Sequence, residues 1–409
     1  MPTSHRCGSA TRKRGVSRRE FLKMVVAAGL LAGCSPARRL EPALALVNGT
    51  LIDGTGTGPV PEAIVVVQAG RIVAVGARAK VAIPPGALVH DVQGATILPG
   101  FINAHVHASY DEATLEAWAQ GGVTTVRDLG NGGSRDELFG FRDAALKNPR
   151  NARLVAVGPI VTVPGGYPIV PWGGRGLTVT SPEHARQEVA QLLDDGADVI
   201  KIALESGVIF RQEIPTLSPE EVAAIVEEAH ARGTLVTVHV TVSRDLERAL
   251  DAGVDDVAHM VTDELPGELI ARMVKAGVYW EPTLELWKGV SSVNPVSYDT
   301  RAIDNLRRFV QAGGKVALGT DYEGYSTQFD LGMPMREIEA MQEAGMTPMQ
   351  IIVAATRNAA HVCNLEREIG TLEVGKIADV LVVDGDPWQD VRALANVRMV
   401  LRDGVVIRE

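Results

Sequence analysis

The chain has 409 residues, of which 46% are hydrophobic and 22% charged, so it can form a sizeable core and is not a disordered protein. Its 50 acidic and 40 basic residues give a net charge of −10, which argues against a nucleic-acid partner because phosphate binding requires a basic surface. Three cysteines are too few for a disulfide framework in a protein of this length.

The first 33 residues differ from the rest in composition. They contain one acid, Glu20, and seven basic residues: Arg6, Arg12, Lys13, Arg14, Arg18, Arg19 and Lys23. An apolar run over 24–32 follows, too short to span a bilayer, which takes about 20 residues. This order is typical of a secretory signal peptide, and SRREFLK at 17–23 resembles the twin-arginine export motif.

The residues LAGC at 31–34 resemble a bacterial lipobox, which implies cleavage before Cys34 and lipidation of its sulfur. We therefore expect a signal peptide over 1–33, a tether over 34–42, and a lipoprotein on the periplasmic or extracytoplasmic face of a membrane. The mature chain would hold 33 basic and 49 acidic residues, a net charge of −16. The alternative is a basic tail with an apolar helix.

Short β segments separated by turns occupy both ends of the mature chain. They are expected at 43–47, 64–68, 71–75 and 88–91, and again at 380–383, 397–401 and 405–407. We expect residues 43–98 and 365–409 to form one small β-sandwich domain. Its histidine, His90, is expected at the surface.

Between these segments, strands alternate with helices. The expected strands are 101–107, 123–128, 153–157, 199–203, 236–239, 257–259, 278–281 and 316–320. Capping boxes with proline at the first helical position begin two of the helices, in SPEE at 218–221 and TPMQ at 347–350. Eight such units predict an α/β fold, a (β/α)8 TIM-like barrel over 99–364, with its active site where the strands end.

Polar residues mark several of those strand ends. His105 and His107, in PGFINAHVH at 99–107, are two residues apart and so project from one face of a strand. Two imidazoles on one face form half of a metal site, although a strand with one core and one solvated histidine reads the same. Later strands end at or carry four more candidates: Lys201, His239, His259 and Asp321.

This set resembles the amidohydrolase superfamily, in particular its imidazolonepropionase-like and prolidase-like members. The resemblance covers the mature chain and extends to GTLEVGKIAD at 370–379. It implies one divalent metal ion on His105, His107 and Asp321, and a second on His239 and His259. Lys201 would bridge them as a carbamate, a bridging hydroxide would attack the substrate, and Asp321 would move the proton.

Imidazole and carboxylate ligands together suit Zn, Mn, Fe or Ni, and zinc is the expected ion. An ammonium group cannot bind a cation, but burial lowers the pKa of a lysine toward the neutral amine. Considered alone, Lys201 is equally consistent with a lysine at a strand edge, and His259 with a histidine in the core. His184, His230 and His361 fall in helical segments and are expected to be structural.

A loop rich in glycine and proline, VPGGYP at 163–168, follows the third strand and is expected to act as a lid, the alternative being a plain surface loop. Prolidase-like relatives tend to place a histidine there and a second polar ring near position 241. This chain has Tyr167, expected to polarise the substrate carbonyl, and Thr241, which weakens a dipeptidase assignment. Arg211, Thr241 and Tyr325 are further candidates for substrate binding, though Arg211 also reads as an exposed loop arginine.

The expected activity is hydrolysis of an amide-type C–N bond in a small substrate: dipeptide-like, N-acyl amino acid or cyclic amide. Ester, lactone or phosphoester hydrolysis would use the same centre. A deaminase is disfavoured because related deaminases lack the lysine and carry glutamate where Val242 stands. A non-catalytic binding lipoprotein is disfavoured because the ligand set is complete. The substrate, the native metal and the oligomeric state stay open.

Overall fold

The computed structural model describes residues 42–323 and 329–409. The expected signal peptide, Cys34, most of the tether and Tyr325 lie outside these residues, so those expectations stay predictions. In the part of the chain that is described, no helix is long and apolar enough to cross a membrane.

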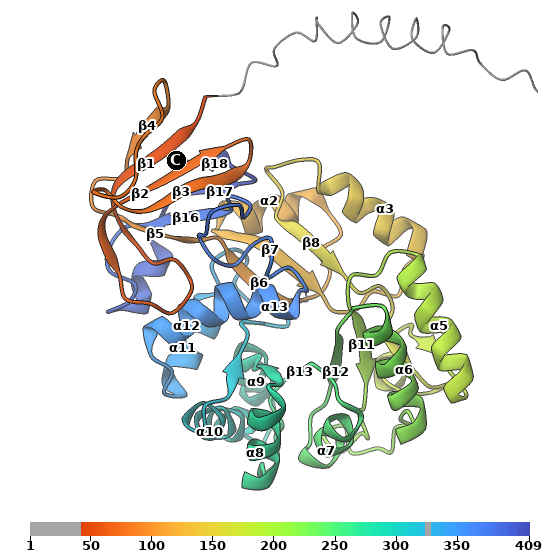
Figure 1. Ribbon diagram of the computed structural model, residues 1–409. Helices are drawn as coiled ribbons and strands as arrows, with labels where there is room; N and C mark the ends of the chain where they lie inside the picture. The colour runs from red at the N-terminus through yellow and green to blue at the C-terminus, as the bar shows by residue number, and fades with distance from the viewer. Residues whose placement is uncertain (1–41, 324–328) are drawn as a thin grey trace, which may run out of the picture. The chain divides into compact units, whose positions relative to one another are not determined.

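Eight strands from both ends of the chain form one sheet, in the order β18-β17-β16-β5-β1-β2-β3, with β4 paired to β1 (Figure 1). They are β1 (Leu44–Leu51), β2 (Val60–Gln68), β3 (Arg71–Ala77), β4 (Leu88–Asp91), β5 (Thr96–Pro99), β16 (Val380–Val383), β17 (Val397–Arg402) and β18 (Val405–Arg408). Strand β16 joins the two ends because it pairs antiparallel with β5, from Val380 opposite Pro99 to Val383 opposite Thr96. The strand pairing assigns all eight strands to one sheet and does not define two separate layers. The expected β-sandwich therefore stays a prediction.

Two hairpins of this sheet turn through the same local chemistry. Ala69 and Gly70, between β2 and β3, have φ of 51° and 78°, and Asp403 and Gly404, between β17 and β18, have 51° and 76°. Two successive residues with positive φ form the turn that matches the twist of antiparallel strands. The two turns touch, since a Cβ on Gly404 would lie 2.8 Å from the Gly70 Cα.

The middle of the chain has the expected alternation of strands and helices, which confirms the α/β class. Strands β6 (Phe101–Val106), β7 (Val123–Asp128) and β8 (Arg153–Ala156) form one parallel sheet. A second parallel sheet has the order β10-β9-β11-β12-β13-β14-β15. Its strands are β9 (Val161–Thr162), β10 (Leu177–Thr178), β11 (Ile200–Ala203), β12 (Val236–His239), β13 (Asp256–Ala258), β14 (Tyr279–Glu281) and β15 (Lys315–Val316).

These two sheets do not join into one continuous ladder. Individual backbone hydrogen bonds connect them. The Ala104 amide donates to the Leu318 carbonyl at 2.8 Å and the Asp321 amide to the His105 carbonyl at 2.9 Å, while at the other edge the Asp198 amide donates to the Ala156 carbonyl at 3.0 Å. Strand β15 has only two residues, so the segment expected as a strand over 316–320 is mostly irregular. The closed eight-stranded barrel and the domain boundaries therefore stay predictions.

Helices follow most of the parallel strands (Figure 1). They are α2 (Glu112–Gln120), α3 (Arg135–Ala145), α4 (Ile169–Trp172), α5 (Pro182–Asp194), α6 (Pro219–Ala231), α7 (Ser243–Ala252), α8 (Gly267–Ala276), α9 (Leu284–Val293), α10 (Tyr298–Gln311), α11 (Met335–Glu343), α12 (Pro348–Val353), α13 (Ala359–Val362), the π-helical η1 (Ala354–Asn358) and the 3₁₀ η2 (Val391–Ala395). Both expected capping boxes are present: Ser218 with Glu221 begins α6, and Thr347 with Gln350 begins α12. These starts are correct because a capping box is satisfied by residues within one helical turn.

Candidate metal centre

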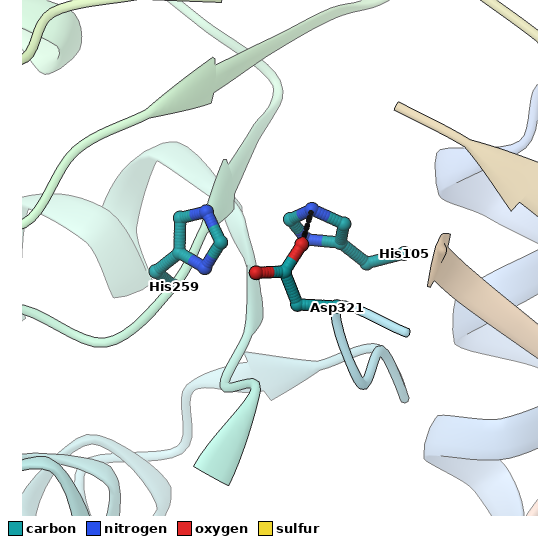
Figure 2. A group of neighbouring side chains, drawn as sticks. All are labelled: His105, His259 and Asp321. Atoms are coloured by element: carbon teal, nitrogen blue, oxygen red, sulfur yellow. Dashed lines mark ion pairs between the residues drawn. The ribbon is translucent and has the colours of Figure 1, made fainter. Parts of the chain in front are cut away.

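Three side chains from distant parts of the sequence converge beside the C-terminal ends of strands β6, β13 and β15. His105 lies near the end of β6, His259 directly follows β13, and Asp321 lies beyond β15. Figure 2 shows the three side chains directed toward one another, and one ligand atom from each lies within 4.8 Å of the others. His259 and Asp321 have φ of 69° and 65°, an uncommon backbone conformation that ends the regular strand where the side chain is presented.

The other predicted histidines extend this group into a row of four rings. The centroids of His105 and His107 are 5.4 Å apart, those of His105 and His259 are 4.7 Å apart, and those of His239 and His259 are 4.7 Å apart. Asp321 Oδ1 lies 3.0 Å from His105 Nε2 and 3.1 Å from His107 Nε2. The structure therefore brings all four histidines and the aspartate together. His184, His230 and His361 are half-buried or exposed and contact Glu188, Asp255 and Tyr279 instead.

Neighbouring groups engage one nitrogen of two rings and leave the other for the site. His107 Nδ1 lies 3.1 Å from the Gly130 carbonyl oxygen, which can only accept, so this nitrogen carries the proton. His259 Nδ1 lies 3.0 Å from Thr283 Oγ1. In both rings Nε2 remains as the candidate ligand atom, the arrangement in which outer partners orient metal-binding imidazoles.

Lys201 projects from β11 into the buried interior, with 1% of its surface exposed. Among the described residues its Nζ has no hydrogen-bond partner. Burial lowers the pKa of this lysine to about 8, against the opposing effect of the Glu281 carboxylate. At pH 7, one unit below this pKa, about a tenth of the lysine is the neutral amine, far more than at the ordinary lysine pKa.

The protonation states suit a divalent cation. Burial lowers the pKa of His105 to about 3 and also lowers the pKa values of His239 and His259, so these imidazoles are neutral. Although burial acts to raise it, His105 and His259 hold the pKa of Asp321 well below its ordinary value. Asp321 raises the pKa of His107 against the effect of burial, so a proton competes for that nitrogen.

Three buried polar atoms at this place have no hydrogen bond within the described chain: His105 Nε2, Lys201 Nζ and Asp321 Oδ1. Buried polar atoms are nearly always paired, so a converging set of unpaired ones calls for a partner other than protein. Neutral imidazoles with a carboxylate are a donor set for a transition metal. The residues present therefore fit the metal that the sequence predicts.

The predicted lid residue reaches the histidine row. The Tyr167 ring stacks on the His239 ring with a centroid distance of 4.1 Å and an interplanar angle of 17°. The Phe210 ring also contacts Tyr167, with a centroid distance of 6.3 Å and an interplanar angle of 29°. The loop from β9 to α4 therefore contacts the site instead of lying apart on the surface.

The candidates for substrate binding have different surroundings. Thr241 is 1% exposed, and its hydroxyl donates to Glu205 Oε2 at 2.5 Å, so the structure gives that hydroxyl a partner in the protein. Arg211 is exposed and has φ of 56°. Tyr325 lies outside the described residues. None of the three assignments is tested by this geometry.

A buried cluster of charged residues next to His105 was not assigned a role from the sequence. Arg127 Nη2 donates to Asp256 Oδ1 at 3.0 Å and also to Glu281 Oε1. The second oxygen of Glu281 lies 3.5 Å from His105 Nδ1. The available signal was an arginine inside a segment predicted to be a strand, since a charge that is buried in a sheet needs a paired partner.

Glu205 was missed as well. This residue follows β11 by two positions, is 1% exposed, and has its Oε2 3.4 Å from His239 Nε2. Although burial acts to raise it, contacts with His239, Thr241 and Gly207 hold the pKa of Glu205 below its ordinary value. Only the tertiary structure places it against His239, which is 34 positions away in the chain.

Comparisons with known proteins agree with this geometry. The profile of the Amidohydrolase family matches residues 96–407. Ochratoxinase of Aspergillus niger is 26% identical over an alignment of 410 residues, covering 86% of this chain and 83% of that protein. Imidazolonepropionase of Symbiobacterium thermophilum is 27% identical over 372 residues, covering 79% and 84%.

Solved structures are similar as well. A Xaa-Pro dipeptidase with methionine in its active site has a TM-score of 0.78 and 26% identity, covering 90% of this chain and all of that one. Molinate hydrolase has a TM-score of 0.77 and 25% identity, covering 90% and 95%. The family match spans most of the chain, and the relatives are named as hydrolases. The chain therefore belongs to the amidohydrolase family and is a metal-dependent hydrolase.

Proposed function

We propose that the protein hydrolyses an amide-type C–N bond in a small substrate at a centre of two divalent metal ions. The observation that carries this proposal is the convergence of four histidines and Asp321. Lys201 lies within their electrostatic environment, and its buried Nζ has no hydrogen bond within the described residues. Six ligands exceed what one four-coordinate ion needs.

His105, His107 and Asp321 would hold one ion, and His239 and His259 the other. Lys201, as a carbamate, would be shared between them. Zinc is our first choice among Zn, Mn, Fe and Ni, the ions that four imidazoles with one aspartate suit. Bound there, the ions would supply Lewis-acid activation of water and of the scissile carbonyl.

The chain's own residues would move the proton and position the substrate. Asp321 is ionised and so can accept the proton of the attacking water and pass it to the leaving nitrogen. Tyr167, stacked on His239, would donate a hydrogen bond from its phenol to the carbonyl oxygen as negative charge develops there. Arg211 and Thr241 remain candidates for substrate contact, as does Tyr325.

The proposed substrate is dipeptide-like, an N-acyl amino acid or a cyclic amide. Support comes from relatives named as an imidazolonepropionase and a Xaa-Pro dipeptidase. Ester, lactone or phosphoester hydrolysis at the same centre is the second candidate. A deaminase or a non-catalytic binding protein is less well supported, since Lys201 is present and all six ligands are retained.

The test is a hydrolysis screen of metal-loaded protein with dipeptides, N-acyl amino acids, cyclic amides, esters and phosphoesters. Release of amine or of a ring-opened acid from the amide sets, abolished by Asp321→Asn, is the expected result. Activity confined to esters or phosphoesters would overturn the amide assignment, and no hydrolysis by a metal-loaded protein would overturn the enzyme assignment.

We also propose that the protein is exported by the twin-arginine route and anchored to a membrane by lipid on Cys34. The support is the order of basic residues, apolar run and cysteine within the first 34 positions.

A further inference from the structure

We infer that Glu205 is the residue that orients His239, by accepting the proton on Nε2 and thereby leaving Nδ1 to bind metal. The inference rests on the proposed metal centre and extends it to a residue outside the predicted ligand set. Glu205 is a positioning residue in this scheme because it acts through His239.

The first support is the position of Glu205. Its side chain is fully buried, and its Oε2 lies 3.4 Å from His239 Nε2. His239 Nε2 is itself buried and has no hydrogen bond of good geometry within the described residues. A shift of a few tenths of an ångström would bring the two atoms to hydrogen-bonding distance.

The second support is the way in which Glu205 is itself held. The Thr241 hydroxyl donates to its Oε2 at 2.5 Å, and the Gly207 amide donates to its Oε1 at 2.5 Å. Gly207 has φ of 88°, and a Cβ there would lie 1.9 Å from the Gln212 carbonyl oxygen, so the turn that supplies this amide requires glycine. Both oxygens of Glu205 are thus surrounded by donors and fixed in place.

The third support is the contact of the His239 ring with Tyr167. Tyr167 stacks on the His239 ring, which limits rotation of the ring about its Cβ–Cγ bond. With Nε2 directed at Glu205, the ring nitrogen left to bind a metal ion is Nδ1. Carboxylates that accept the second N–H of a metal-binding histidine fix its tautomer and raise its basicity.

Glu205→Gln is a sharp test because it preserves volume but changes one oxygen to a donor. If the amide nitrogen faces His239, it donates to Nε2, and the proton then sits on Nδ1, where it blocks metal binding. If the amide nitrogen faces Gly207, two N–H groups point at each other, and the hydrogen bond from the Gly207 amide is lost. Neither orientation reproduces the wild-type pattern. Glu213→Gln, an exposed glutamate in the same loop, is the matched control.

The measurement is a titration of metal-free protein with Zn²⁺ against a competing chelator, which needs no substrate. We expect Glu205→Gln to weaken binding of one of two ions by about 10- to 100-fold, with Glu213→Gln unchanged. Thr241→Val should shift the same ion in the same direction by a smaller factor, because it removes one of the two groups that hold Glu205.

Two outcomes would overturn the inference. One is a Glu205→Gln protein whose two affinities stay within twofold of wild type. The other is lower thermal stability of the metal-free variant with unchanged affinity, which would assign Glu205 to holding the loop alone. Failure of wild type to bind any divalent ion would instead overturn the proposed function, so the two failures are distinguishable.

Discussion

Tyr167 lies flat against His239, with ring centroids 4.1 Å apart and planes inclined by 17°. The contact joins a loop after β9 to the last residue of β12, so this loop and the histidine row meet at one imidazole. We predict that Tyr167→Phe, which keeps the ring and removes the hydroxyl, lowers kcat by roughly tenfold to a thousandfold with little change in KM. Steady-state kinetics on the substrate found by the screen will measure it.

Two further variants separate the effect of the Tyr167 hydroxyl from other causes of a lower kcat. Tyr167→Ala removes the stacking as well, so a fall in kcat shared equally by Phe and Ala assigns the effect to the hydroxyl. Asp321→Asn should be far less active than either, because it removes both a ligand and the proton carrier. An unchanged kcat in Tyr167→Phe would remove the phenol from the mechanism.

Lys201 should determine how many metal ions the protein holds. We predict close to two divalent ions per chain in wild type and the loss of at least one in Lys201→Ala, because the buried lysine lies among the ligands and has no other partner within the described residues. Elemental analysis of purified protein measures this, with the exposed Lys147→Ala as control. At most one ion in active wild type, unaffected by the lysine change, would contradict the two-metal centre.

A buried pair of carboxyl groups should make stability fall as pH rises. Glu337 accepts the amides of Leu284 and Glu285 at 3.0 and 2.7 Å, and Glu285 accepts the Asp330 amide at 3.0 Å. Burial raises the pKa of Glu285 to about 9 and that of Glu337 to about 7. The folded protein therefore binds more protons than the unfolded chain between pH 4.5 and these values.

The stabilisation is fully present below about pH 4.5 and is lost as pH rises through 7 to 9, by at most about 1.4 kcal/mol per pH unit for each group. Glu285→Gln cannot titrate, so we predict a flatter dependence of the urea midpoint on pH between 5 and 9. Glu339→Gln, exposed on the same helix as Glu337, should leave the wild-type slope intact. Equal slopes in all three proteins would show that Glu285 does not titrate in this range.

Export should depend on the paired arginines. We predict that Arg18→Lys combined with Arg19→Lys retains precursor in the cytoplasm, and that Cys34→Ala releases the protein from membranes. Cell fractionation with immunodetection measures both, and the stable anchor implies more than one acyl chain because a single chain binds weakly. Normal export of the double lysine variant would exclude the twin-arginine route.

Local sequence patterns were enough to predict the α/β class, the strands that carry the histidines, and the starts of α6 and α12. Each depends on residues close together in the chain: alternation along a strand, or a cap satisfied within one turn. The convergence of His105, His107, His239, His259 and Asp321 was expected from the sequence because the strands of the predicted (β/α)8 barrel all end at the same face.

Tertiary structure alone decided which groups surround these side chains. The contacts of Thr283 with His259, of Glu205 with His239, and of Asp256 and Glu281 with Arg127 join residues 24 to 154 positions apart. The sequence can show that a charged residue falls inside a strand, as Arg127 does, but it does not show which distant residue that charge contacts. An unpaired charge or hydrogen-bond donor costs free energy only after water has been excluded from it. That happens when distant segments fold against one another, so these partners are chosen by the tertiary structure.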